Sequence, residues 1–322
     1  MKRITIKPIL ACNANCEFCY ERKALFKNKK TMLSIKKWEK ILREATKAGA
    51  HQLSISGGEP FLYQKLPKLV SIAKEKDFFV NINTNASLIT KANLIKLKKV
   101  GLDSLTISLH SLNSHEMDKI KKIKGLLKQI KKAIKLIKKT GILLTIQSIL
   151  SKNNYKSFDK LIRFDLKNKA DGIAISYPEA DYSTKNLLMN KKQILEFKTL
   201  VLPKIIKLIN KSHLKNKEQV IKKFQGVYNW KDFSLTNAAK GIFKKNGNEC
   251  KIPFDFALIL QNGDVLPCNA IEYFHTPIIG NVEKKSLTTT LNSKKMRLFQ
   301  KNKISQCKYC PMELSFKTNL IY

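Results

Sequence analysis

The segment RITIKPILACNANCEFCY, residues 3–20, joins a strand-like run to a group of closely spaced cysteines. Its first half is rich in β-branched residues that alternate with other types, which is typical of a strand. Its second half places Cys12, Cys16 and Cys19 in a CxxxCxxC pattern on the loop after that strand. Three thiolates can bind three irons of a 4Fe-4S cube and leave the fourth iron without a protein ligand. A partial zinc knuckle and a chance spacing are the alternatives.

The run Arg3–Leu10 is the first of six strand-like runs that alternate with helical patterns. The later runs are His51–Ser56, Phe79–Thr84, Ser104–Leu109, Ile142–Leu150 and Gly172–Tyr177. Segments with a 3.6-residue period are Ser34–Ala48, Tyr63–Lys76, Thr90–Val100, Glu116–Thr140 and Tyr155–Leu166. Expected N-caps are Ser34 and Thr90, and glycines typical of helix ends are Gly49, Gly101 and Gly141. The alternation predicts an α/β fold with a parallel sheet, either open and doubly wound or curved like a barrel.

One face of these predicted strands is polar. Its members are Ser54, Ser56, Asn81, Asn83, Asn85, Thr106, Ser108, His110, Thr145 and Gln147. A parallel sheet that is covered by helices on both faces is apolar on both, so a polar face favours a concave interior open to a polar ligand. The alternative is that some of these strands are shorter or lie at an edge.

The second predicted strand runs into Gly57-Gly58-Glu59-Pro60, which on its own is only a turn. Together, the CxxxCxxC loop after strand one and the GGEP after strand two resemble the radical S-adenosylmethionine (radical SAM) superfamily, over about residues 3–178. In that family SAM chelates the open iron, and one electron cleaves SAM to give a 5′-deoxyadenosyl radical that abstracts a substrate hydrogen. The resemblance implies a partial (β/α)6 TIM-like barrel, in agreement with the six units and their polar face.

The resemblance also implies roles for individual residues. The cluster ligands would be Cys12, Cys16 and Cys19. Residues that would surround SAM are Phe18 on the adenine side and, beside the methionine amino group, Gly57, Gly58, Glu59 and Pro60. Polar side chains that would face the ribose and carboxylate are Thr84, Asn85 and Ser108, each of which has the alternative of being an ordinary polar strand residue.

A second group of thiols comprises Cys250, Cys268, Cys307 and Cys310, with Gly263 five residues before Cys268. Four cysteines that end in CxxC suit a zinc ribbon. After a radical SAM barrel, however, the pattern resembles the twitch domain, a shortened SPASM domain that binds an auxiliary 4Fe-4S cluster. Four thiols suffice for one such cluster and leave none of its irons open to substrate. This favours an electron-transfer role for the cluster, which suits net oxidation of the substrate. Molybdenum-cofactor cyclases are disfavoured, since their second cluster has three cysteine ligands and their chains end in Gly-Gly.

The expected domains are a radical SAM barrel at 1–185, a helical or irregular linker at 186–246 and a small α+β auxiliary domain at 247–322. Acid or base candidates at strand ends are His110, Tyr177 and Glu179, and candidates that follow Cys268 are Glu272 and His275. The alternative for each is a solvated or cap-forming side chain.

The formal charge is 62 − 24 = +38, and only five of the 62 basic residues are arginines. This balance allows nucleic-acid binding without favouring it, because planar phosphate recognition prefers arginine. Residues 117–139 look like a basic membrane-surface helix, yet between two strands they are expected to pack on the sheet. No apolar run approaches the roughly 18 residues of a membrane span, and no secretory signal is present. Tight grouping of the seven cysteines favours metal ligation in a reducing compartment, so a cytoplasmic location is expected.

The leading hypothesis is a radical SAM oxidoreductase that dehydrogenates, crosslinks or epimerises a small polar molecule such as an amino sugar, or a peptide. It would need a low-potential electron donor of the flavodoxin or ferredoxin type. The predicted barrel begins at Arg3, so an N-terminal leader-recognition domain is not expected, which favours a small molecule or a separately recruited peptide. The alternatives are a radical SAM enzyme that modifies tRNA, and a non-enzymatic, metal-bearing protein that binds nucleic acid.

Overall fold

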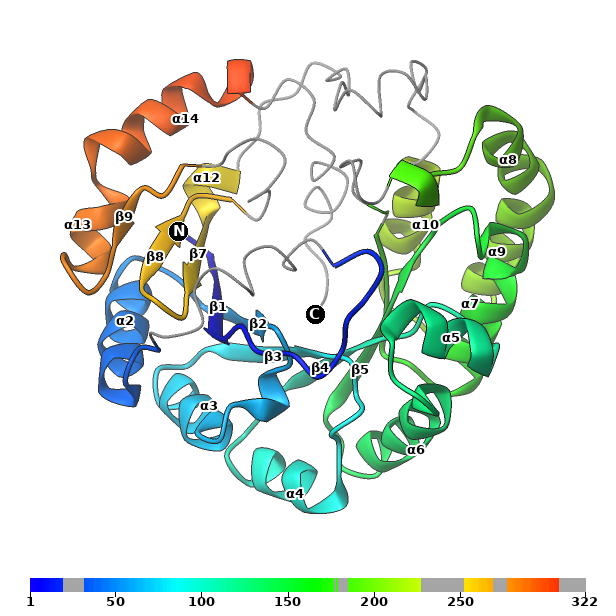
Figure 1. Cartoon of the computed structure of the whole chain (residues 1–322), viewed down its shortest axis with the longest axis horizontal. Helices are drawn as coiled ribbons and strands as arrows, with labels where there is room; N and C mark the ends of the chain where they lie inside the picture. The colour runs from blue at the N-terminus through cyan, green and yellow to red at the C-terminus, as the bar shows by residue number, and fades with distance from the viewer. Residues whose placement is uncertain (20–31, 177, 179–184, 227–251, 269–276, 307–322) are drawn as a thin grey trace.

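The computed structural model describes residues 1–19, 32–176, 178, 185–226, 252–268 and 277–306. Their strands form one sheet in the order β6-β5-β4-β3-β2-β1-β7-β8-β9. The first six strands are β1 Arg3–Ile9, β2 Gln52–Gly57, β3 Phe79–Thr84, β4 Ser104–Ser108, β5 Leu143–Ile149 and β6 Gly172–Ser176. All six are parallel, and the sheet curves into a partial barrel with helices outside it (Figure 1). The predicted fold class is confirmed.

The sheet continues beyond β1 into the C-terminal third of the chain. β7 Phe256–Leu260 pairs parallel to β1, whereas β8 Asp264–Leu266 and β9 Gly280–Asn281 follow in antiparallel pairs. The C-terminal helices are α12 Ile252–Asp255, α13 Leu287–Leu291 and α14 Lys294–Gln306. This α+β region therefore shares backbone hydrogen bonds with the barrel along the whole of β7.

The remaining helices follow the strands in turn and lie outside the sheet (Figure 1). They are α2 Ile35–Lys47, η1 Pro60–Leu62, α3 Leu66–Lys74, α4 Lys91–Lys99, α5 Ser114–Lys121, α6 Leu126–Lys138, η2 Tyr155–Ser157, α7 Phe158–Lys167, η3 Lys185–Leu187, α8 Lys191–Glu196, the π-helical η4 Phe197–Val201, α9 Leu202–Asn210 and α10 Lys217–Gly226. Both predicted N-caps are confirmed, since Ser34 accepts from the amide of Lys37 and Thr90 forms a capping box with Asn93. The three predicted helix-end glycines have φ of 86°, 85° and 72°.

Helix α6 shows why the basic segment belongs to the fold. Its apolar stripe is buried, with exposures of 5% or less at Leu126, Leu127, Ile130, Ile134 and Ile137. Each such side chain contributes about 1.5–3 kcal/mol relative to an exposed one, as an upper estimate. The prediction that this stripe packs inward is confirmed. Among the described residues, no helix is long and apolar enough to cross a membrane.

The prediction of one helix over Glu116–Thr140 is wrong, because the chain breaks between α5 and α6. Lys122 ends α5 with φ of 57° and Gly125 has φ of 70°, both left-handed. The carboxylate of Asp118 accepts from the amides of Gly125 at 2.7 Å and Leu126 at 3.0 Å, so it caps the start of α6. The apolar period continues through the break, and this conceals it in the sequence.

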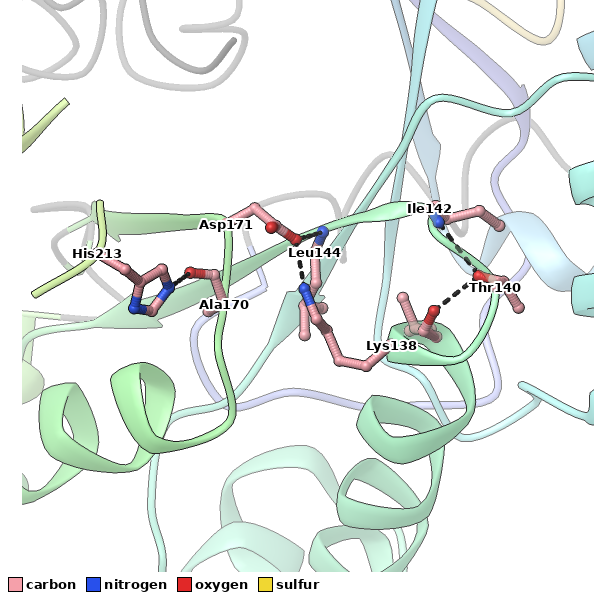
Figure 2. Close-up of polar contacts among 8 residues, drawn as sticks. Lys138, Thr140, Ile142, Leu144, Ala170, Asp171 and His213 are labelled. Atoms are coloured by element: carbon pink, nitrogen blue, oxygen red, sulfur yellow. Dashed lines mark hydrogen bonds and ion pairs between the residues drawn. The ribbon is translucent and has the colours of Figure 1, made fainter. Parts of the chain in front are cut away.

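Polar contacts also tie α6 to the amino ends of β5 and β6 (Figure 2). Asp171 accepts from Lys138 Nζ at 2.9 Å and from the amide of Leu144 at 2.8 Å. The hydroxyl of Thr140 donates to Ile137 O, and His213 Nε2 donates to Ala170 O at 2.9 Å. These contacts lie at the edge of the sheet opposite the cysteine loop, where residues of parallel barrels serve stability more than catalysis.

On β2, β3 and β4, polar side chains of the predicted polar face form hydrogen bonds with one another. Asn83 Nδ2 donates to Ser54 Oγ, and Asn81 Nδ2 donates to Asn83 Oδ1, both at 3.0 Å. Thr106 Oγ1 donates to Asn81 Oδ1 at 3.0 Å, which extends the chain of hydrogen bonds to β4. The inner face is therefore polar and internally ordered across three neighbouring strands.

Candidate functional site

The cysteine loop leaves the carboxyl end of β1, at the edge of the sheet where parallel barrels build their active sites. Cys12, Cys16 and Cys19 are half-buried and form no disulfide. Burial raises the pKa of the Cys12 thiol, and a hydrogen bond from the amide of Ala14 to its sulfur opposes that rise. Among the described residues, no three His, Cys, Asp or Glu side chains gather as they would around a single metal ion.

One side of this loop is held by the carboxyl end of α5. The amide of Asn15 donates to Lys121 O at 3.1 Å, and the amide of Glu17 donates to Ile120 O at 3.0 Å. The last carbonyls of a helix lack intrahelical partners, so the end of α5 can accept both amides. Figure 1 shows the dark blue loop after β1 running toward α5. The break after Lys121, which sequence periodicity conceals, is what frees these carbonyls for the loop.

The other side of the loop is held by a hydrogen-bonded ring of three side chains, Asn13, Asn85 and Ser87. Asn13 Nδ2 donates to Ser87 Oγ at 2.8 Å, and Ser87 Oγ donates to Asn85 Oδ1 at 2.6 Å. Asn85 Nδ2 then donates to Asn13 Oδ1 at 2.9 Å, which closes the ring. The structure thus places Asn85, expected to face SAM, in direct contact with the residue next to Cys12.

Glu59 lies beneath this ring and is fully buried. Its Oε1 accepts from Thr84 Oγ1 at 2.7 Å and from the amide of Phe61 at 3.1 Å, and its Oε2 accepts from the amide of Asn85 at 2.9 Å. Burial raises the pKa of Glu59, while the three hydrogen bonds lower it. The carboxylate that was expected beside the methionine amino group therefore joins the end of β2 to the end of β3.

The two glycines before Glu59 allow the backbone at the end of β2 to approach the cysteine loop. Gly58 N donates to Ile9 O at 3.0 Å, and Glu59 N donates to Ala11 O at 2.9 Å. A Cβ on Gly57 would overlap Ile9 O, and one on Gly58 would overlap Ala11 O. Gly57 also has φ of 122°, which side chains disfavour. The packing of the protein's own backbone therefore requires glycine at both positions, independently of any bound ligand.

His110 and Phe18 meet beside the loop. His110 is 3% exposed, and its ring lies edge-to-face on Phe18 with centroids 4.7 Å apart. The amide of Ile149 donates to His110 Nδ1 at 3.2 Å, so the neutral ring carries its proton on Nε2. Nε2 is buried without a partner among the described residues. Burial, with the charge of Lys121, lowers the pKa of His110 well below its usual value, which makes the ring a hydrogen-bond donor instead of a cation.

Lys121 is a site residue that sequence reasoning missed. It is 5% exposed, and its Nζ lies 5.5 Å from the centroid of the Phe18 ring. Its charge lowers the pKa values of Cys12, Glu59 and His110, so it supplies positive potential to the whole site. Its residue type does not distinguish it from the neighbouring lysines. Its burial is seen only in the structure, where α5 ends and Lys122 has φ of 57°.

Comparison with known proteins decides the family. A family model described as the radical SAM superfamily matches residues 6–164, and a model of the SPASM iron-sulfur cluster-binding domain matches residues 250–311. The chain carries a radical SAM domain, followed by a SPASM-like domain in its C-terminal part. The cofactors are accordingly SAM and a 4Fe-4S cluster in the barrel, and an auxiliary iron-sulfur cofactor in the C-terminal region. Three half-buried thiols that form no disulfide, on one anchored loop, are a donor set that fits the first cluster.

Relatives of the chain include a curated PqqA peptide cyclase from Granulibacter bethesdensis, 28% identical over 151 residues. That match covers 47% of this chain and 40% of the relative, so the chain matches less than half of that protein. SuiB of Streptococcus suis bound to S-adenosylmethionine is 21% identical with a TM-score of 0.71, over 92% of this chain and 67% of that one. The enzyme anSMEcpe with bound AdoMet is 17% identical with a TM-score of 0.69, over 97% and 87%. These structures share the fold.

The remaining predicted site residues are placed as follows. Pro60 is buried at the start of η1, and Ser108 is half-buried at the end of β4. Cys268 is 6% exposed just after β8, and the SPASM match favours iron-sulfur binding there over a zinc ribbon. Residues that lie outside the described part are Cys250, Cys307, Cys310, Tyr177, Glu179, Glu272 and His275. Their roles stay predictions.

The ring beside Cys12 leads to a testable expectation. Replacing Ser87 by alanine removes a hydroxyl that accepts from Asn13 and donates to Asn85. Asn13 then keeps only its hydrogen bond with Asn85, so the cysteine loop should open more easily. A partly exposed pair of neutral hydrogen bonds contributes about 1 kcal/mol, or about a fivefold change in an opening equilibrium. We expect iron to be lost to a chelator about fivefold faster in Ser87→Ala. The control Ser71→Ala removes one exposed hydrogen bond on α3 and should lose iron at the wild-type rate, and equal rates in all three proteins would contradict the expectation.

Proposed function

We propose that this enzyme cleaves SAM reductively and uses the resulting radical to oxidise a peptide. When bound, SAM and the reduced cluster supply a 5′-deoxyadenosyl radical that abstracts a hydrogen atom from the substrate. The observation that carries the proposal is the loop of Cys12, Cys16 and Cys19, fixed between the end of α5 and the Asn13–Asn85–Ser87 ring. The expected cluster ligands therefore have a defined place at the barrel mouth.

The residues around this loop suit a zwitterionic, adenine-bearing ligand. The buried ammonium of Lys121 can attract a carboxylate, since no acidic side chain is ion-paired with it among the described residues. Phe18 offers an aromatic face that a base can stack on, and His110 offers an unpartnered Nε2–H. Ser108 ends the neighbouring strand and can present its hydroxyl to the same ligand.

A peptide substrate is supported by relatives, whose printed names describe a PqqA peptide cyclase and SuiB bound to the precursor peptide SuiA. Oxidation is supported by the four C-terminal thiols, which would hold one auxiliary cluster, and such a cluster would supply an acceptor for the electron that the substrate radical gives up. A small polar substrate would use the same inner face of Ser54, Asn83 and Thr106. Thiolate-bound clusters need reducing conditions, which supports the expected cytoplasmic location.

The proposal is tested by incubating the anaerobically reconstituted chain with SAM and dithionite. We expect 5′-deoxyadenosine and methionine to form, and a short-peptide library to yield products lighter by two hydrogens. Absence of SAM cleavage from a protein that carries its full iron complement would refute the reaction. Cleavage that is stimulated by tRNA and by no peptide would refute the peptide substrate and favour a tRNA-modifying enzyme.

A further inference from the structure

A basic groove runs between the amino end of α5 and the outward face of α6. Its volume is about 450 Å³, and its lining residues are Ser114, Leu127, Lys128, Lys131, Lys132 and Lys135. The four lysines are exposed and follow a helical spacing opposite the buried stripe of α6. None of them makes an ion pair with any residue in the described part of the chain.

The groove lies in a strongly basic stretch, where Lys138 with Asp171 is the one ion pair among the described residues. Residues 119–140 contain ten lysines and neither an acidic residue nor an arginine. Lysines four apart on a helix repel each other, as Lys128 and Lys132 do, which slightly destabilises the helix. An acidic partner would relieve that repulsion. Charge complementarity also speeds the encounter of two proteins, by about 10-fold to 1,000-fold at low salt.

The groove is close to the cysteine loop along α5. Ser114 at the first turn of α5 lines the groove, whereas the carbonyls of Ile120 and Lys121 at its last turn hold the loop. A helix of eight residues is about 12 Å long. A protein that sits in the groove would therefore lie one short helix away from the expected cluster ligands, on the outside of the barrel and clear of the polar inner face.

We propose that this groove is the docking surface for a small acidic one-electron donor protein of the flavodoxin class. The inference rests on the proposed function, because the cluster must receive one electron for each SAM cleaved. That electron leaves the reduced donor, which is oxidised by one electron, and enters the cluster held by the β1 loop. A nucleic acid fits less well because arginine is absent from the face. A peptide substrate fits less well because it must reach the inside of the barrel.

The test compares two charge-reversed variants of the reconstituted full-length chain. One carries Lys128→Glu, Lys132→Glu and Lys135→Glu in the groove. The control carries Lys91→Glu, Lys96→Glu and Lys99→Glu on α4, where the lysines are equally exposed and no acidic residue interrupts them. Each variant changes the charge by −6, and glutamate is a good helix former at all six positions. The probe is a recombinant flavodoxin with its NADPH-dependent reductase.

We expect the groove variant to bind flavodoxin with a Kd raised about tenfold at low salt and to lose the same factor in flavodoxin-driven SAM cleavage. The α4 control should change either quantity less than about twofold. Cleavage driven by dithionite, which needs no docking, should equal wild type in both variants. Failure of dithionite-driven cleavage in the wild type would count against the proposed function, whereas the Kd values would still test the groove.

Two results would overturn the inference. Equal losses in the groove and α4 variants would show that flavodoxin senses only the overall charge of +38. An unchanged flavodoxin Kd together with selective loss of tRNA binding in the groove variant would assign the surface to nucleic acid.

Discussion

Replacing Cys12, Cys16 and Cys19 together by alanine is expected to lower the iron content of the reconstituted chain from about eight to about four atoms and to abolish SAM cleavage. The three thiols share one loop that the end of α5 and the Asn13 ring hold in place, so no other described thiol can take over their role. The measurement is iron and zinc per chain by metal analysis, with 5′-deoxyadenosine as the second readout.

The complementary variant replaces the C-terminal thiols Cys250, Cys268, Cys307 and Cys310 by alanine. It should also retain about four irons, and it should still cleave SAM while substrate oxidation is lost. About four irons in the wild type, falling to none in the β1-loop variant with one zinc retained, would contradict the expectation. That result would indicate a structural zinc site in the C-terminal region, which would then hold no cluster able to accept an electron.

Local signals explain which parts of the fold could be read from the sequence. The strands from Arg3 to Ser176 lie within about two residues of their predicted bounds, because period-2 runs between turns leave few alternatives. The caps at Ser34 and Thr90 are equally local. The break at Lys122 was missed because it depends on the Asp118 carboxylate and on a lysine with positive φ, while the apolar period runs on. The pairing of β7 with β1 was missed because it joins segments some 250 residues apart.

The candidate site likewise has features that the sequence predicts and features that depend on tertiary packing. The spacing of Cys12, Cys16 and Cys19 is a property of one short segment and was readable. The inward position of Lys121 and the part that Ser87 plays in the ring depend on how distant segments meet, and neither residue type is unusual in this chain. Glu59 was singled out for its motif, yet its bonds to Thr84 and Asn85 follow from the packing of β2 against β3.

Replacing Glu59 by alanine is expected to lower the free energy of unfolding by about 3–5 kcal/mol. The substitution leaves the hydroxyl of Thr84 and the amides of Asn85 and Phe61 without their acceptor, and an unsatisfied buried donor costs about 1–3 kcal/mol. Because Asn85 also holds Asn13, the cysteine loop should lose iron faster in this variant. Chemical denaturation and chelator-driven iron loss measure the two effects.

Two further substitutions make the expectation specific. Glu75→Ala removes an exposed carboxylate that accepts from Ser71 at 2.9 Å, and it should change stability by less than about 0.5 kcal/mol. Glu59→Gln keeps an oxygen for Thr84 but turns an amide toward the Asn85 N–H, so it should cost about 2 kcal/mol. Equal stability of Glu59→Ala and Glu75→Ala would show that the buried carboxylate is dispensable.

The pH dependence gives an independent check on the same carboxylate. Burial raises the pKa of Glu59 above its usual 4.5, so the folded protein binds this proton more tightly than the unfolded chain does. The stabilisation from the bound proton is complete below pH 4.5 and is lost as the pH rises through the raised pKa. The difference in unfolding free energy between wild type and Glu59→Gln should therefore shrink as the pH rises above 4.5, since glutamine does not titrate. A difference that grows with pH would mean that the three hydrogen bonds outweigh burial and that the carboxylate is ionised in the folded state.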